Sequence, residues 1–266
     1  MSRHAAHQLG RPGADGLLAV LLHGMEDGWQ TWRSLAGFLD PSWRVVALDL
    51  PWHPGNDYRW RHAASAGEWV RHLLDGLDHQ PDVIVAHSFG ASALLEALAR
   101  SPRPLCRAVV LVAPVVRPAG LEITWEVFDR ARAQFSEVIG DTLLVRLGRR
   151  AGQVDEELRA GMAQIMVRRI GPRGFMSLFE QFVLTAELPL RDVPTPALVL
   201  VGGKDPGLVG GLVGGRDGGL TAAMPSASVE LISHYDHFCH VEYAEDVARR
   251  LVEFVREALP NGRVND

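Results

Sequence analysis

The pentapeptide Ala86-His87-Ser88-Phe89-Gly90 joins a β-branched apolar run to a helix-forming run, Ala91–Ala99. It follows the pattern Gly-x-Ser-x-Gly, with alanine in the first place. Small residues on both sides of the serine let a strand and a helix pack closely around a tight turn, which exposes the hydroxyl as a nucleophile. The alternative is a buried serine at a strand end without chemical function. We take Ser88 as the candidate nucleophile.

A serine nucleophile needs a base and a carboxylate that orients this base. Asp205 follows an apolar run through a Gly-Gly-Lys turn, and an aspartate just beyond the carboxyl end of a strand can point into a site above the sheet. Its alternative role is a turn or helix-cap aspartate, since Pro206 and Gly207 come next. His237 lies between the last apolar run and the last helical stretch. The order serine, aspartate, histidine is that of one fold that uses this chemistry.

Three histidines, His234, His237 and His240, recur at every third position and raise the question of a metal site. Zinc ligands usually show wider or helical spacing, and no further cluster of cysteine and histidine completes a ligand set. The serine chemistry needs only one of the three. We therefore predict no metal ligand and no cofactor.

The oxyanion that forms during acyl transfer needs two N–H donors. The apolar run that ends in His23-Gly24-Met25 turns on a glycine, and the backbone N–H of Met25 is one candidate donor. The N–H of Phe89, directly after the candidate nucleophile, is the other. We expect His23 to hold this loop beside the substrate pocket.

The elements that must position these residues alternate along the chain. Short runs rich in Val, Leu and Ile are separated by amphipathic helical stretches, which indicates a mostly parallel α/β sheet with helices on both faces. The predicted strands are Leu17–Leu22, Arg44–Leu48, Val83–Ala86, Ala108–Val112, Ala197–Val201 and Val229–Ile232. Apolar residues with a 3.6-residue period predict helices at Gln30–Leu39, Ser65–Leu77 and Val241–Leu259.

The alternation breaks between residues 115 and 190, where no strand is expected. Helical stretches near Glu122–Ile139, Asp155–Ile170 and Pro172–Glu187 occupy this part of the chain. The sequence predicts a core of residues 1–114 and 191–266 and a helical lid insertion at 115–190; the alternative is a pair of ordinary crossover helices with long loops. Aromatic side chains of the insertion, among them Trp125, Phe128 and Phe179, are candidates to line a substrate pocket, although such residues also pack helices onto a core.

Composition narrows the function classes. The 266 residues carry a formal charge of −5 and no basic run, so nucleic acid is not an expected partner. No apolar stretch is long enough to insert into a membrane, and the polar N-terminus shows no signal-peptide core, so a cytoplasmic location is expected. The two cysteines give no disulfide framework. The oligomeric state cannot be read from the sequence.

These motifs resemble those of the α/β-hydrolase superfamily over most of the chain. The turn Leu22-His23-Gly24 resembles the family's oxyanion segment, and Asp49–Asp57 resembles an altered Asp-x-x-Gly-His-Gly-x-Ser segment. The serine pentapeptide and the Gly-Gly-Lys-Asp loop resemble the nucleophile motif and the acid loop. Asp236–Glu242 resembles the family pattern Gly-His-Phe-x-His-x-Glu, and this match selects His237 over the other two histidines.

Two departures from the family pattern affect the site. Asp236 replaces the usual glycine beside the histidine, where it can compete with Asp205 for the imidazole or raise the histidine pKa. Glu26 and Asp27 stand where the family often has small residues. Such charges usually face solvent, and if they faced the site they would disfavour anionic substrates.

The resemblance implies a carboxylesterase-like serine hydrolase with a lid over an apolar cleft, which cleaves an ester, thioester, lactone or similar activated carbonyl of a small, fairly hydrophobic molecule. The same fold also hosts acyltransfer, C–C bond hydrolysis, elimination and cyclisation, and a dry lid would favour transfer or cyclisation. A third alternative is a small-molecule binding protein without catalytic activity. Sequence alone does not separate these outcomes, because one fold serves many functions.

Overall fold

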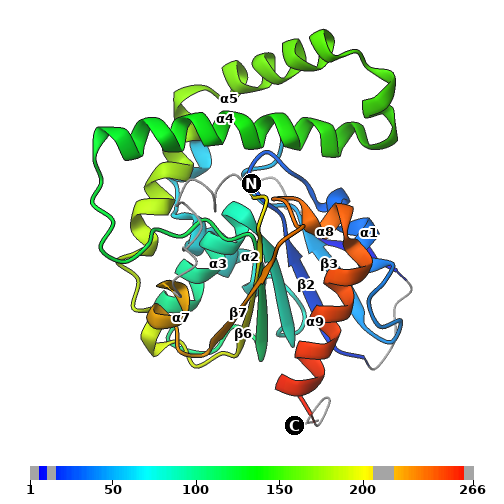
Figure 1. The fold of residues 1–266 in the computed structure, drawn as a ribbon. Helices are drawn as coiled ribbons and strands as arrows, with labels where there is room; N and C mark the ends of the chain where they lie inside the picture. Colours follow the sequence, from blue (N-terminus) through cyan, green and yellow to red (C-terminus); the bar gives the residue numbers. More distant parts are fainter. Residues whose placement is uncertain (1–5, 11–15, 206–218, 261–266) are drawn as a thin grey trace.

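The computed structural model describes residues 6–10, 16–205 and 219–260. Its centre is a seven-stranded sheet in the order β1-β3-β2-β4-β5-β6-β7 (Figure 1). Only the edge strand β1 runs antiparallel to its neighbour. The strands are β1 (Ala6–Leu9), β2 (Leu18–Leu22), β3 (Arg44–Leu48), β4 (Val83–His87), β5 (Ala108–Val112), β6 (Ala197–Gly202) and β7 (Ala227–Ile232). The predicted α/β class with a mostly parallel sheet is therefore confirmed.

All six predicted strands are present, and their ends shift by no more than two residues. The central strands β2, β4 and β5 are buried at every position, which explains their unbroken apolar sequences. The strand that the sequence analysis missed is β1. Its four residues are mostly half-buried or exposed, because an edge strand needs little apolar sequence when it pairs on one side only.

Helices cover both faces of the sheet and form two separate apolar cores (Figure 1). One face carries α1 (Arg33–Ala36), α8 (Cys239–Glu242) and α9 (Ala244–Ala258), and the other carries α2 (Ala66–Asp75), α3 (Ser88–Arg100) and α7 (Gly219–Ala223). The predicted helix at 30–39 is shorter than expected. A 3-10 turn, Trp29–Trp32, precedes α1, which ends at Gly37, a residue with low helix propensity.

Two long helices lie between β5 and β6 in the chain. They are α4 (Trp125–Leu147) and α5 (Glu156–Thr185), and they pass over one end of the sheet (Figure 1). The last two helical stretches predicted for this segment form the two halves of α5, which meet at a kink. Its backbone kinks at Gly171, where φ is 60°, directly before Pro172. No helix in the described part of the chain is long and apolar enough to cross a membrane.

Beyond this kink, α5 packs onto the core. Phe175, Phe179 and Phe182 are buried in the same apolar cluster as the side chains of α3. The Gln181 side chain donates a hydrogen bond to the Ser92 carbonyl oxygen, at 3.2 Å. This half of the segment is thereby held against the helix that begins at Ser88.

Candidate active site

Ser88 is the first residue of α3 and directly follows β4. Its φ is 52°, a left-handed conformation that costs a non-glycine residue about 1–3 kcal/mol. The turn is tight, because a Cβ placed on Gly90 would lie 2.4 Å from the His23 carbonyl oxygen. A Cβ on Gly24 would lie 3.2 Å from the Ser88 Cβ. At Gly90 a side chain would collide with backbone, and at Gly24 it would be tightly crowded, so the β2 loop packs closely against the serine.

The structure brings Ser88, His237 and Asp205 into one hydrogen-bonded chain. The His237 Nε2 lies 2.9 Å from the Ser88 Oγ, and its Nδ1 lies 2.8 Å from the Asp205 Oδ2. All three residues are buried. Asp205 reaches the histidine because the strand end β6 approaches the histidine loop closely: a Cβ on Gly202 would lie 2.4 Å from the Tyr235 carbonyl oxygen.

The pKa of His237 is raised above its usual value. Burial by itself would lower it, but the charge and hydrogen bond of Asp205 outweigh burial, with further contributions from Asp141 and Asp236. Asp236 does not replace Asp205 as the partner of the ring: its Oδ1 accepts a hydrogen bond from the Phe238 N–H at 2.8 Å. Through its charge, Asp236 raises the pKa of the histidine, one of the two effects that the sequence left open.

The two candidate oxyanion donors belong to segments that meet at Ser88. The Phe89 N–H lies in the first turn of α3, where backbone N–H groups have no intrahelical acceptor. Met25 follows Gly24, which contacts the serine. The next residue, Glu26, has a φ of 55° and donates its N–H to the Trp52 carbonyl oxygen at 2.9 Å. This hydrogen bond fixes the turn beyond Met25.

The two acids of this loop are buried, contrary to the usual solvent-facing position of such charges. Glu26 accepts a hydrogen bond from the Tyr58 hydroxyl at 2.6 Å and pairs with Arg169 of α5. Asp27 accepts hydrogen bonds from the Gly28 N–H at 2.8 Å and the Thr31 hydroxyl at 3.1 Å. Burial raises the pKa of Asp27 to about 7, so this carboxyl group carries less than its full charge near neutral pH.

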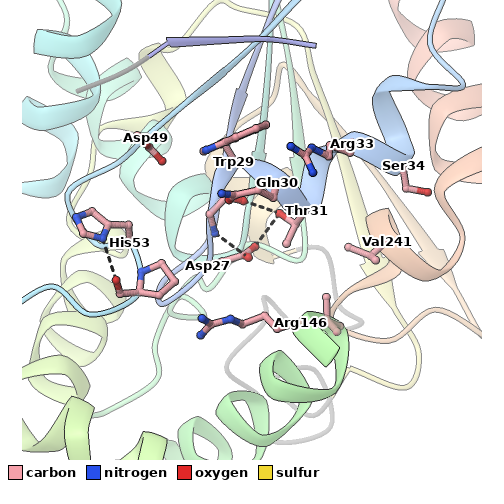
Figure 2. Close-up of a pocket in the computed structure, with 13 residues that line it drawn as sticks. Asp27, Trp29, Gln30, Thr31, Arg33, Ser34, Asp49, His53, Arg146 and Val241 are labelled. Atoms are coloured by element: carbon pink, nitrogen blue, oxygen red, sulfur yellow. Dashed lines mark hydrogen bonds between the residues drawn. The ribbon is translucent and has the colours of Figure 1, made fainter. Parts of the chain in front are cut away.

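A cavity of about 720 Å³ opens beside this loop (Figure 2). Asp27 lies on one side of it, and Arg146 of α4 lies on the other (Figure 2). Its wall contains acidic side chains, basic side chains and the aromatic ring of Trp29. The described residues that line it are Asp27, Gly28, Trp29, Gln30, Thr31, Arg33, Ser34, Asp49, His53, Pro54, Val145, Arg146 and Val241. Ser88 is not in this set, and it is 6% exposed.

The pocket residues predicted from sequence lie elsewhere. His23 is fully buried, with Nδ1 2.8 Å from the Gly24 carbonyl oxygen and Nε2 accepting from the Leu50 N–H at 3.0 Å, so it holds the loop. Trp125 is 78% exposed, while Phe128 and Phe179 make an edge-to-face contact, with ring centroids 5.1 Å apart, in an aromatic cluster of α4 and α5. Apolar side chains on a helix turn toward the core: Phe179 is buried there, and Phe128 packs against it half-buried.

Sequence reasoning missed the polar wall of the cavity. Asp27, His53 and Arg146 show no periodicity or motif that marks them as neighbours. One signal was available: the loops of Asp27 and His53 follow strands β2 and β3, and the carboxyl ends of parallel strands form the usual ligand edge of such a sheet. Arg146 belongs to the insertion, whose placement no local pattern determines.

Two further histidines lie beside the hydrogen-bonded chain. His87 is the last residue of β4, and its ring centroid lies 5.0 Å from that of His237. His240 lies in α8, with its centroid 4.1 Å from that of His87. Burial lowers the pKa of His87 well below the usual value and that of His240 to about 3. Both imidazoles are therefore neutral.

Known proteins resemble this chain in sequence over most of its length. The sequence model of the alpha/beta hydrolase family matches residues 19–250. A 2-hydroxymuconate semialdehyde hydrolase of Pseudomonas putida is 27% identical over 262 residues, which cover 92% of this chain and 89% of the relative. A protein of the same name from Pseudomonas sp. strain CF600 is 25% identical over 264 residues, or 91% and 88% of the two chains.

Solved structures show the same fold at lower identity. A meta-cleavage product hydrolase from Pseudomonas fluorescens superposes with a TM-score of 0.66 at 20% identity, over 96% of this chain and 94% of that one. An epoxide hydrolase of Bacillus megaterium gives a TM-score of 0.65 at 16% identity, over 95% and 96%. At such identities the likeness concerns the fold alone.

Proposed function

Since the chain belongs to the alpha/beta hydrolase family, we propose that it hydrolyses a small carbonyl compound through a covalent intermediate on Ser88. The observation that carries this proposal is the chain of hydrogen bonds from Ser88 through His237 to Asp205, at 2.9 and 2.8 Å. A neutral imidazole within hydrogen-bond distance of a hydroxyl is the arrangement that a general base needs. The left-handed backbone of Ser88 and the close approach of Gly24 support the same role.

The reaction has two steps, acylation of Ser88 and hydrolysis of the acyl-enzyme. The Ser88 Oγ attacks the substrate carbonyl carbon while His237 Nε2 takes the hydroxyl proton, and Asp205 stabilises the imidazolium. The backbone N–H groups of Met25 and Phe89 donate to the carbonyl oxygen as it becomes negative. The imidazolium then gives its proton to the leaving group. Water repeats these steps on the acyl-enzyme and releases a carboxylic acid, so no external cofactor takes part.

The bond that is broken separates two candidate activities. The first is hydrolysis of an ester, thioester or lactone, for which the leaving group is an oxygen or sulfur atom. The second is hydrolysis of a C–C bond next to a carbonyl group, and it is favoured by the relatives named after 2-hydroxymuconate semialdehyde. That compound contains no ester, so its hydrolysis breaks a carbon–carbon bond. Its carboxylate also suits the guanidinium groups of Arg33 and Arg146 on the cavity wall, and the raised pKa of Asp27 on the same wall reduces the repulsion of that carboxylate.

We further propose that residues 115–190 act as a lid over the site. Val145 and Arg146 of α4 line the cavity, and Arg146 lies opposite the β2 loop (Figure 2). Asp141, one turn earlier on α4, contributes to the raised pKa of His237. The helix therefore faces both the cavity and the base, a position that suits exclusion of water during the reaction.

Labelling with a fluorophosphonate probe tests the nucleophile. The parent protein should react, and Ser88→Ala should abolish labelling while the thermal unfolding midpoint stays near that of the parent. Ser92→Ala is the matched control, because this serine is equally buried one turn along α3 and donates to the Val115 carbonyl oxygen at 2.6 Å. A folded parent that does not react, and turns over no substrate, would favour a binding protein instead.

Two substrates separate the candidate activities. The parent and Ser88→Ala proteins are assayed with p-nitrophenyl esters of increasing chain length and with 2-hydroxymuconate semialdehyde. Turnover of the second compound that depends on Ser88 and exceeds ester turnover in kcat/KM identifies C–C hydrolysis. The opposite ratio identifies an esterase. We expect the loss in Ser88→Ala to be about 10⁶-fold in kcat for the true substrate.

A further inference from the structure

Three buried side chains outside the Ser88–His237–Asp205 chain point their donor atoms toward one place. They are Asp27, His87 and His240, which are 2%, 1% and 0% exposed. One ligand atom of each, a carboxylate oxygen or an imidazole nitrogen, lies within 4.8 Å of the other two. The three residues come from three different segments: the loop after β2, the end of β4 and helix α8.

The histidines of this cluster lack hydrogen-bond partners where one would be expected. The His87 Nε2 lies 2.8 Å from the His237 carbonyl oxygen. Since a carbonyl can only accept, Nε2 carries the proton and Nδ1 of the neutral ring keeps its lone pair. Within the described part of the chain this Nδ1 has no partner, and neither ring nitrogen of His240 has one.

Buried nitrogen atoms without a hydrogen-bond partner are candidates to bind a cation. A buried polar atom without a partner costs about 1–3 kcal/mol, and native proteins contain few of them. Here three occur on two adjacent rings beside a buried carboxylate. A single cation bound to Nδ1 of His87 and to one ring nitrogen of His240 would give two of these three atoms a partner and would balance the carboxylate charge.

We propose that Asp27, His87 and His240 bind one divalent transition-metal cation of the Zn²⁺ type. Two imidazole nitrogens and a carboxylate oxygen form a ligand set that suits zinc and similar ions, whereas Mg²⁺ and Ca²⁺ prefer oxygen ligands alone. Ligand atoms on a tetrahedral zinc ion lie about 3.3 Å apart. Side-chain movements of about 1 Å bring the cluster to that spacing from its present limit of 4.8 Å.

The atoms around the cluster match the second shell of a metal site. Ligating imidazoles commonly donate their other N–H to a backbone carbonyl, as His87 does to His237. The carboxylate is oriented by the Gly28 N–H and the Thr31 hydroxyl. Asp27 also lines the cavity, so the ion would enter the cluster from that side.

The ion would connect the segments that carry the catalytic residues. Asp27 follows the candidate oxyanion donor Met25 by two residues, His87 precedes Ser88, and His240 lies three residues after His237. Fixing these segments to one ion would restrict their relative motion. The three ligands are therefore positioning residues, and binding of the ion should raise thermal stability whether or not the proposed reaction takes place.

Metal binding is tested on protein produced without a histidine tag and treated with a chelator. Isothermal titration with Zn²⁺ should give one site per chain, and Zn²⁺ should raise the unfolding midpoint where Mg²⁺ does not. Co²⁺ should give the visible absorption bands of a nitrogen- and oxygen-bound ion. His240→Gln should lose at least about tenfold in Zn²⁺ affinity. His234→Gln is the matched control, since this histidine lies in the turn before α8 and is exposed.

Diffraction at the zinc absorption edge gives a test without any variant. Anomalous signal between Asp27, His87 and His240 in Zn²⁺-soaked crystals establishes the site. A water molecule at that place in the presence of Zn²⁺, or equal affinity in the His240→Gln and parent proteins, overturns the proposal. The fluorophosphonate result does not depend on this outcome, so failure of the metal site and failure of the proposed function remain distinguishable.

Discussion

Two buried clusters built from similar residues lie side by side in this protein. In the first, both ring nitrogens of His237 have a hydrogen-bond partner, Asp205 at 2.8 Å and Ser88 at 2.9 Å. In the second, the rings of His87 and His240 lie beside Asp27 with three nitrogen atoms unpartnered among the described residues. A carboxylate near an imidazole is thus common to both, and the hydroxyl on the strained turn of Ser88 distinguishes the first.

The electrostatic consequences differ in the same way. Burial lowers the pKa of His87 and His240, and within the described residues no anion accepts a hydrogen bond from either ring to offset it. His237 is equally buried, yet the carboxylate of Asp205, hydrogen-bonded to its ring, raises its pKa. The same degree of burial therefore gives a base in one cluster and neutral lone pairs in the other. Base catalysis suits the first, and metal ligation suits the second.

The same substitution in both clusters gives the largest expected contrast. Asp205→Asn should lower kcat by about 10⁴-fold, because an amide does not stabilise the imidazolium and selects the wrong tautomer of His237. The loss of kcat in Asp27→Asn should be at least about a hundredfold smaller. Asp27 accepts its hydrogen bonds from Gly28 and Thr31 and not from His237. Steady-state kinetics of both variants in chelator-treated protein, with unfolding midpoints as a check on folding, provide the measurement. Equal losses would mean that the two carboxylates share one role.

A second test concerns the loop that serves both clusters. Glu26 is fully buried and is held by Arg169 of the insertion, whose side chain is 39% exposed. Arg169→Ala leaves this carboxylate with its Tyr58 and Asn56 hydrogen bonds only, so the free energy of unfolding should fall by about 1–3 kcal/mol.

The matched control for this variant is Arg132→Ala. Arg132 pairs with Asp129 on the surface of α4, where both side chains are 65% exposed. This substitution should change the free energy of unfolding by less than about 1 kcal/mol in urea titrations. If both substitutions lower the free energy of unfolding by the same amount, α5 does not stabilise the β2 loop through Glu26.

The smallest expected effect is a shift of the pH–rate profile. Asp141 of α4 helps to raise the pKa of His237, and the neutral imidazole is the base, so kcat/KM rises as the pH increases through this pKa. Asp141→Asn should therefore move the acid limb of the profile to lower pH, by a fraction of a pH unit. The profile is measured with chelator present, so that no bound cation contributes. Asp129→Asn, at an exposed position of the same helix, should leave the limb in place.

Much of the central architecture could be predicted because its signals are local. A strand buried on both faces is apolar at every position, so β2, β4 and β5 were evident from composition alone. The edge strand β1 was missed for the opposite reason, because it has four residues of which only Leu9 is buried, and these leave no pattern. Helix α1 came out shorter than its periodicity suggested, since Gly37 follows it.

The predicted pocket shows where sequence reasoning ends. Periodicity predicts an apolar face for each helix but does not distinguish a cavity from a core. Phe179 is buried in the core, and Phe128 packs against it half-buried. Burial of Glu26 was equally hidden, because its partner Arg169 belongs to a distant helix. No pattern in the sequence around these residues predicts either contact.

The sequence by itself determined the order of the strands along the chain and the residue types at their ends, including Ser88, Asp205 and His237. These signals depend on backbone preference and side-chain chemistry within a few residues. Only the tertiary structure decided that His240 lies beside His87 and Asp27, and that Arg146 faces the same cavity. Such distances follow from the sheet order and from the packing of helices over it, which join segments far apart in the chain and therefore leave no local trace.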